Sequence, residues 1–138
     1  MSSFKIFDVA GSGMSAQSVR LNTTASNLAN ADSVSGDPNQ VYKAKHPLFE
    51  AIRTGLGKDA STAGVSVKGI FESQAPASAR YEPGNPLADA EGMVVYSNVN
   101  SVAEMADMMS ASRAFETNVE VLGRIKTMQQ SLLKLGEG

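Results

Sequence analysis

Hydrophobic side chains recur at helical spacing near both ends of this 138-residue chain. Toward the amino terminus the repeat is strictly sevenfold and is formed by Phe7, Met14, Leu21 and Leu28. Small residues accompany this seam, no proline interrupts it, and a cluster of turn-forming residues follows at 30–38. The pattern predicts one long helix over residues 4–31 that buries its seam against another helix.

A second and stronger helical pattern lies toward the carboxyl terminus. Its apolar stripe follows three-and-four spacing and includes Met105, Met108, Phe115, Val119, Leu122 and Ile125. Ser101 and Glu104 have the spacing of a capping box, and Lys134 followed by Gly136 suits the carboxyl end of a helix. We therefore predict a single helix over residues 101–135.

The period changes between these two helices. Residues 41–49, 65–72, 79–82 and 93–96 are typical of strands, with a loop at 55–64 and a turn-rich surface segment at 81–92. The predicted fold is α+β and mainly α, with the long terminal helices paired as an antiparallel coiled coil around a small β-rich insertion. The predicted divisions are an N-terminal helical arm (1–35), the insertion with its surface loop (36–98) and a C-terminal helical arm (99–138), the two arms forming one helical core domain.

An insertion of this size is too small to cover two arms of four or more turns each. Paired long helices normally leave apolar stripes that only neighbouring subunits can bury, and such packing supplies most of their stability. Each Leu, Met or Phe buried in this way contributes on the order of 1.5–3 kcal/mol. We therefore expect the subunit to complete its fold by assembling with other molecules.

Composition removes several classes of function. The net charge is −2, so no basic surplus favours nucleic acid. The chain has no cysteine and one histidine, His46, which disfavours thiol chemistry and metal clusters, and we expect no cofactor and no catalytic residues. No segment approaches the roughly 20 apolar residues of a membrane span, and the start of the chain lacks the pattern of a cleaved signal peptide.

One motif offers an alternative function. Residues Gly11 to Ala16 match the G-x-G-x-x-A dinucleotide fingerprint, follow a strand-like run at 6–10, and precede Asp32 by about 20 residues. This would make the chain a small dinucleotide-binding domain. However, residues 25–31 contain no β-branched run to form a second strand, and no alternation of strand and helix follows. Small residues that allow close approach of a partner helix explain the motif better.

The remaining polar candidates favour structural roles. Asp89 with Glu91, and Glu104 with Asp107, could pair for acid–base chemistry, but acids are common where loops and helices begin. A self-contained monomeric binding module is a third alternative. Asn27 and Asn30 lie near the end of the first helix, where we hypothesise that they bond backbone and hold the turn into the insertion.

Short motifs at both ends of the chain resemble those of a known family. Residues 25–31 (Ala-Ser-Asn-Leu-Ala-Asn-Ala) are similar to the S-N-x-A-N signature of flagellar rod, hook and hook-associated axial proteins. The match is closer at 81–86, 88–92, 98–100, 104–109, 112–113 and 117–120, and the first of these segments contains Pro83, Gly84, Asn85 and Pro86. Together these motifs resemble the C-type proximal-rod subunit of the bacterial flagellar basal body.

The resemblance implies a mechanical role without turnover. Members of this family are exported without a cleaved signal by the flagellar type III apparatus, and their terminal helices order as they polymerise. The implied location is the periplasmic rod of the basal body, in the drive shaft between motor and hook. The implied partners are copies of the same chain, other rod subunits, the base of the rod with its membrane ring complex, and the export apparatus.

Overall fold

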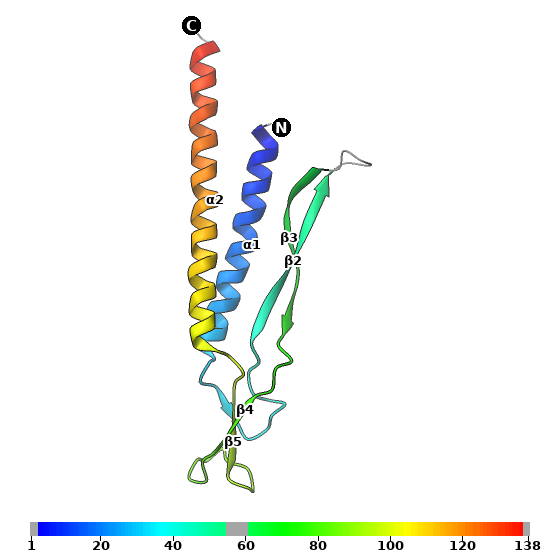
Figure 1. The fold of residues 1–138 in the computed structure, drawn as a ribbon, viewed down its shortest axis with the longest axis vertical. Helices are drawn as coiled ribbons and strands as arrows, with labels where there is room; N and C mark the ends of the chain where they lie inside the picture. The colour runs from blue at the N-terminus through cyan, green and yellow to red at the C-terminus, as the bar shows by residue number, and fades with distance from the viewer. Residues whose placement is uncertain (1–2, 55–60, 137–138) are drawn as a thin grey trace.

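Two long helices lie side by side in the computed structural model, which describes residues 3–54 and 61–136. α1 (Ser3–Ala29) has 27 residues and α2 (Ser101–Gly136) has 36, or about 40 and 54 Å at 1.5 Å per residue. Both termini lie at the same end of the elongated molecule, and α2 extends past the start of α1 (Figure 1). The two predicted helices are confirmed, with ends within two residues of those expected.

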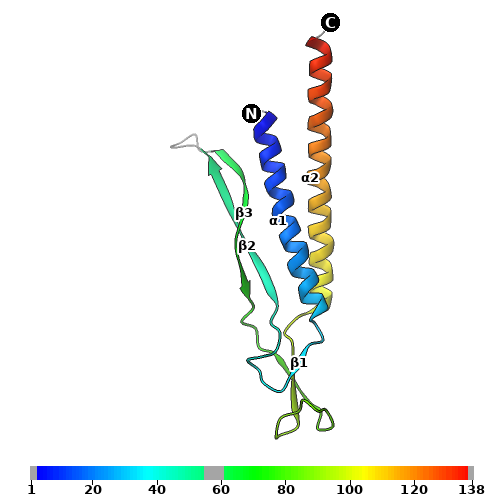
Figure 2. The same ribbon diagram turned by 180° about the vertical axis from the view of Figure 1, so that it is seen from behind.

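A long antiparallel hairpin runs along α1 on the side away from α2 (Figures 1 and 2). It consists of β2 (Lys45–Thr54) and β3 (Ser61–Glu72). The strand predicted at 41–49 was wrong at 41–44 and continues past 49 to Thr54, and β3 is longer than the predicted 65–72. The predicted loop at 55–64 was wrong in its last four residues, while 55–60 lie outside the described residues. Gly64 belongs to β3, where a Cβ atom would lie 2.6 Å from the Ser12 hydroxyl oxygen. That hydroxyl accepts a hydrogen bond of 3.1 Å from the Val65 amide, so hairpin and helix meet at close range.

A small three-stranded sheet occupies the opposite end of the molecule from the chain termini (Figure 1). Its strands are β1 (Val34–Ser35), β4 (Ser78–Tyr81) and β5 (Met93–Tyr96), in the antiparallel order β1-β5-β4. The connection at 82–92 is turn-rich, as predicted. The Glu82 carboxylate accepts hydrogen bonds from Asn85 Nδ2 (3.0 Å) and the Tyr96 hydroxyl (2.8 Å), which lower the pKa of Glu82. This segment is therefore an ordered turn fixed by its own side chains.

The fold rules out the dinucleotide-binding alternative. Residues 6–16 lie inside α1, so the strand, glycine turn and helix that would hold a pyrophosphate are absent there. At Gly13 an added Cβ would lie 3.1–3.3 Å from the side chain of Asn118 on α2. At this level the motif brings two helices close together.

The N-cap of α2 lies one residue before Ser101, the residue predicted to cap this helix. Asn100 is the N-cap, because its side-chain oxygen accepts a 3.1 Å hydrogen bond from the Ala103 amide and its carbonyl accepts the Glu104 amide. The Glu104 side chain is turned inward and bonds to α1. Neither of the two described helices is long and apolar enough to cross a membrane.

Candidate assembly interface

The least exposed residues of α2 follow three-and-four spacing along its length. Buried and half-buried positions recur as Glu104, Met108, Ala111, Phe115, Asn118, Leu122 and Ile125. On α1 the corresponding face consists of Gly13, Ala16, Arg20, Thr23 and Asn27. The facing surfaces thus contain a high proportion of small and polar side chains, and Ile125 is the only large aliphatic residue among the described buried positions of either helix.

An ion pair joins the helices in the half nearest the small sheet. Arg20 on α1 donates from both Nε and a terminal nitrogen to the two carboxylate oxygens of Asp107 on α2, with an Nε to Oδ2 distance of 3.0 Å. The Thr24 hydroxyl donates to the same carboxylate at 3.2 Å. The hydrogen bond from Arg20 holds the pKa of Asp107 below its ordinary value, and the same bond raises the pKa of Arg20.

Two helical turns beyond Arg20 on α1, Asn27 is fully buried and uses both ends of its amide. Its Nδ2 donates to the Glu104 carboxylate (3.0 Å) and to the Lys45 carbonyl (2.8 Å). Its Oδ1 accepts from the Lys45 amide (2.8 Å) and from the Tyr42 hydroxyl (2.9 Å). A single side chain therefore connects α1, α2 and the entrance to the hairpin.

A second asparagine fixes the segments around that entrance. Asn98 Oδ1 accepts the Ala44 amide at 2.7 Å, and its Nδ2 donates to the Ala75 carbonyl at 2.8 Å. The Ser73 amide bonds to the Ala44 carbonyl at 2.7 Å. The approaches to β2, β4 and α2 are thereby tied together beside Asn27.

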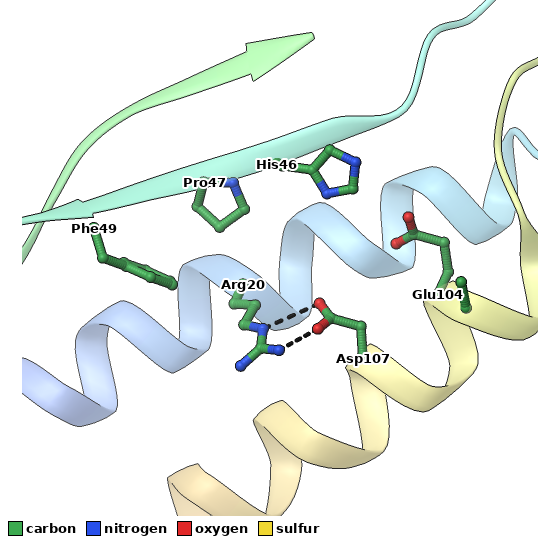
Figure 3. Close-up of a pocket in the computed structure, with 7 residues that line it drawn as sticks. Arg20, His46, Pro47, Phe49, Glu104 and Asp107 are labelled. Atoms are coloured by element: carbon green, nitrogen blue, oxygen red, sulfur yellow. Dashed lines mark hydrogen bonds and ion pairs between the residues drawn. The ribbon is translucent and has the colours of Figure 1, made fainter. Parts of the chain in front are cut away.

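A cleft of about 520 Å³ opens between β2 and the start of α2, next to the ion pair (Figure 3). It is lined by Arg20, His46, Pro47, Phe49, Ala103, Glu104 and Asp107. Its two carboxylates are already bound, Asp107 to Arg20 and Glu104 to Asn27. This engagement makes Glu104 and Asp107 structural and leaves them unsuited to the acid–base role considered from sequence. The described residues contain no group of three or more His, Asp or Glu side chains able to hold a metal ion.

The structure separates the predicted packing residues into three levels of exposure. Ile125 is buried and belongs to the least exposed face of α2. The residues of the N-terminal seam and the middle of the C-terminal stripe are half-buried: Phe7, Met14, Leu21, Leu28, Met108, Phe115 and Leu122. Met105 and Val119 are exposed, by 56% and 46%.

Much of the apolar surface of α2 faces outward. Nine large hydrophobic side chains on this helix are exposed: Val102, Met105, Met109, Val119, Val121, Met128, Leu132, Leu133 and Leu135. Val102, Met105 and Met109 lie near the start of α2. Leu132, Leu133 and Leu135 lie in its last two turns, and the end of this helix extends past α1 (Figure 1). Contiguous exposed apolar surface is typical of a protein–protein interface.

The predicted turn residues lie in the connection between β4 and β5, and the two asparagines lie at the end of α1. Pro83, Gly84 and Pro86 are exposed, while Asn85 is half-buried and bonds Glu82. Asn30 donates from Nδ2 to the Ser26 carbonyl at 2.8 Å, at the end of α1. Asn27 reaches beyond its own helix to the backbone of Lys45.

Sequence reasoning missed the partners of these residues. Arg20, Thr24, Asp107 and Asn98 were given no packing role, and Glu104 was interpreted as a cap. One signal was available for Arg20, because it is among only three charged residues in positions 1–31. A charge that becomes partly buried when its helix packs needs a counter-charge on the element that covers it.

Comparison with protein families gives matches at both ends of the chain. Residues 7–36 match the family described as "Flagella basal body rod protein". Residues 90–135 match the family described as "Flagellar basal body rod FlgEFG protein C-terminal". The two matched regions contain most of α1 and α2, including Arg20, Asn27, Glu104 and Asp107.

Curated relatives match over nearly the whole length. The chain is 52% identical over 137 residues to the flagellar basal-body rod protein FlgC of Escherichia coli O6:H1, with 99% of this chain and 100% of the relative covered. It is 51% identical, with the same coverage, to FlgC of Salmonella typhimurium. It is 35% identical to FlgC of Agrobacterium fabrum, with 92% and 90% covered.

Proposed function

Because the chain belongs to the FlgC family of flagellar basal-body rod proteins, it is a structural subunit of the flagellar rod and not an enzyme, and we propose that it polymerises through the outer faces of its terminal helices. As a rod subunit it forms part of the shaft that carries torque from the motor to the hook. The observation that carries the proposal is the set of nine exposed hydrophobic side chains on α2.

The size of this surface supports assembly. Fully burying one exposed Leu, Met or Val contributes on the order of 1.5–3 kcal/mol, so covering most of the nine gives a stabilisation comparable to the cost of about 4–15 kcal/mol for lost translational and rotational freedom on association. Within the subunit, the inner face of α2 follows the three-and-four spacing of a coiled coil and faces a similarly spaced face of α1. These patterns support a paired-helix core whose outside is completed by neighbours.

The division of the chain, its partners and its location are proposed as well. We infer that the arms 1–35 and 99–138 form the helical core and that 36–98 is an outer insertion. Copies of the chain and other rod subunits would cover the predicted stripes. The family relationship supports association with the rod base and membrane ring complex, export by the type III apparatus, and a periplasmic location.

The test uses residues that the isolated subunit exposes. Met105→Asp and Leu132→Asp should leave the helix content and urea midpoint of the purified chain unchanged, because neither side chain is buried in the subunit. Each should abolish motility and remove this subunit from isolated basal bodies. Gln130→Asp, at an exposed polar position of the same helix, is the matched control and should assemble normally. Normal rods from both hydrophobic variants would refute the proposed surface.

A further inference from the structure

We propose that Met105, Met109 and Met128 are oxidation sites of the unassembled subunit, and that their conversion to methionine sulfoxide prevents the chain from entering the rod. The oxidants concerned transfer one oxygen atom and accept two electrons, as hypochlorous acid and hydrogen peroxide do. The inference rests on the proposed function, because it assigns a chemical sensitivity to the outer surface of α2.

Methionine is concentrated on the outside of α2. Six of the seven methionines of the chain lie within the described residues, and four of these six belong to this helix. Met105, Met109 and Met128 are 56%, 59% and 50% exposed. Met108 on the same helix is half-buried, as are the methionines of α1 and β5. Every described methionine that is exposed therefore lies on the helix surface to which we assign assembly.

Two of the three exposed methionines border grooves on α2. Met109 lines a groove of about 340 Å³ together with Ala106, Ser110 and Arg113. Met128 lines another of about 560 Å³, whose lining residues also belong to α2. No other described element contributes to either groove, so both are open on the side away from the rest of the subunit. An oxidant and a neighbouring subunit can therefore reach the same side chains.

The chemistry requires a thioether and an oxidant of this class. The methionine sulfur loses two electrons and gains the oxygen atom of hypochlorous acid, while chloride and a proton leave. With hydrogen peroxide the second product is water. The chain has no cysteine, so no thiol of its own competes for the oxidant. Methionine sulfoxide reductases restore the thioether, which makes the block reversible.

A sulfoxide at these positions opposes burial. It turns a flexible apolar side chain into a polar one and disrupts interfaces that contain methionine. The three proposed sites are among the nine exposed hydrophobic side chains of α2. Losing the burial of one methionine weakens an association by about tenfold or more, so oxidation of all three should reduce incorporation by at least that factor. Neighbours that cover α2 in the rod should shield the thioethers, so the sensitive interval lies before assembly.

Replacement by leucine provides the test, because leucine keeps the approximate volume and apolar character of methionine but cannot form a sulfoxide. Two full-length chains are compared in cells that lack the natural one. The first chain keeps the proposed sites and replaces the three half-buried methionines: Met14→Leu, Met93→Leu and Met108→Leu. The second chain carries these changes and also replaces the proposed sites: Met105→Leu, Met109→Leu and Met128→Leu.

Synthesis of each chain is induced during a pulse of hypochlorous acid, and the basal bodies that contain it are then counted. The dose is one at which mass spectrometry finds the proposed sites of the unassembled first chain mostly oxidised. Without oxidant the two chains should form equal numbers of rods. After the pulse the first should form about tenfold fewer rods than the second, since damage to other proteins is common to both. Equal losses would overturn the proposal.

A control distinguishes these sites from exposed methionine in general. Adding Leu87→Met to the second chain places a methionine at a position that is 48% exposed and lies outside α2. This chain should form as many rods after the pulse as the second chain does. A loss as large as that of the first chain would mean that oxidation at any exposed position excludes the subunit, which would also overturn the proposal.

A smaller set of changes keeps the test decisive if the sixfold replacement itself prevents assembly. The natural chain is then compared with the Met105→Leu, Met109→Leu and Met128→Leu variant, in which every replaced side chain is exposed in the subunit. This variant should keep about tenfold more rods after the pulse, and equal losses would contradict the proposal. Failure of the proposed function is distinguishable, because it would appear without oxidant, as normal rods from the Met105→Asp and Leu132→Asp chains.

Discussion

Replacing Asn27 by alanine should destabilise the subunit more than any other single polar truncation on α1. The side chain is fully buried and takes part in four hydrogen bonds, two with the Lys45 backbone, one with Tyr42 and one with the Glu104 carboxylate. Alanine fills none of the vacated space and leaves these groups without a partner. The loss thus affects both helices and the entrance to the hairpin together.

The size of the effect follows from those contacts. A neutral hydrogen bond contributes about 1 kcal/mol and one to a charged group about 1.5–3 kcal/mol. Water that enters the vacated space would satisfy part of this demand, so we expect a loss of about 3–5 kcal/mol. That is a large share of the 5–15 kcal/mol typical of folded domains. With a urea dependence of about 2 kcal/mol per molar, the midpoint should fall by roughly 2 M.

Urea unfolding followed by circular dichroism measures this loss. The matched control is Asn30→Ala, which removes one hydrogen bond to the Ser26 carbonyl near the exposed end of the same helix and should cost less than about 1 kcal/mol. Asn27→Asp retains the shape but places a second carboxylate against Glu104, so it should be no better tolerated than alanine. An Asn27→Ala chain within about 1 kcal/mol of the Asn30→Ala chain would refute the reasoning.

Three further outcomes follow from the geometry. The pKa of Asp107 is lowered in the folded chain, so its ion pair should stabilise the fold above the ordinary aspartate pKa of about 3.9. This stabilisation should be lost as the pH falls through the lower pKa of the folded chain. In Asp107→Asn the urea midpoint should therefore depend less on pH over this acid range. Gly64→Ala should loosen the hairpin from α1 and speed amide exchange in β3, whereas Gly69→Ala, with open space around the added carbon, should not. Gly92→Ala should cost about 1–3 kcal/mol in thermal unfolding because φ is +77° and the Tyr81 ring lies 2.9 Å from the added carbon, while Gly84→Ala should be nearly neutral.

The helices could be predicted from the sequence because their signal is local. Spacing of Met105, Met108 and Phe115 within one segment indicates a helix whatever that helix packs against. Strand ends were less well predicted. Gly64 was assigned to a loop because glycine often ends strands, whereas its place in β3 depends on contact with Ser12. Conformational preferences of a glycine do not reveal which neighbour requires its missing side chain.

The contacts between elements could not be predicted from local sequence patterns, because they join residues that are far apart in the chain. The Asn27 cluster unites residues 27, 42, 45 and 104, which no spacing rule connects. Glu104 also carried a misleading signal, because its distance from Ser101 fits a capping box while Asn100 caps the helix instead. With the first-turn amide already satisfied, the carboxylate was available to α1.

The distribution of polar and apolar groups on the helices has a mechanical consequence. Hydrogen bonds and an ion pair lie between α1 and α2, and large hydrophobic side chains lie on the outside of α2. Polar contacts lose most of their strength over small displacements, so they fix the alignment of the pair inside one subunit. Apolar contacts are non-directional and grow with area, so they suit an interface that must hold many neighbours together under load. A subunit built this way would have its helix pair aligned by polar contacts within the rod and would gain most of its remaining stability from the neighbours around it.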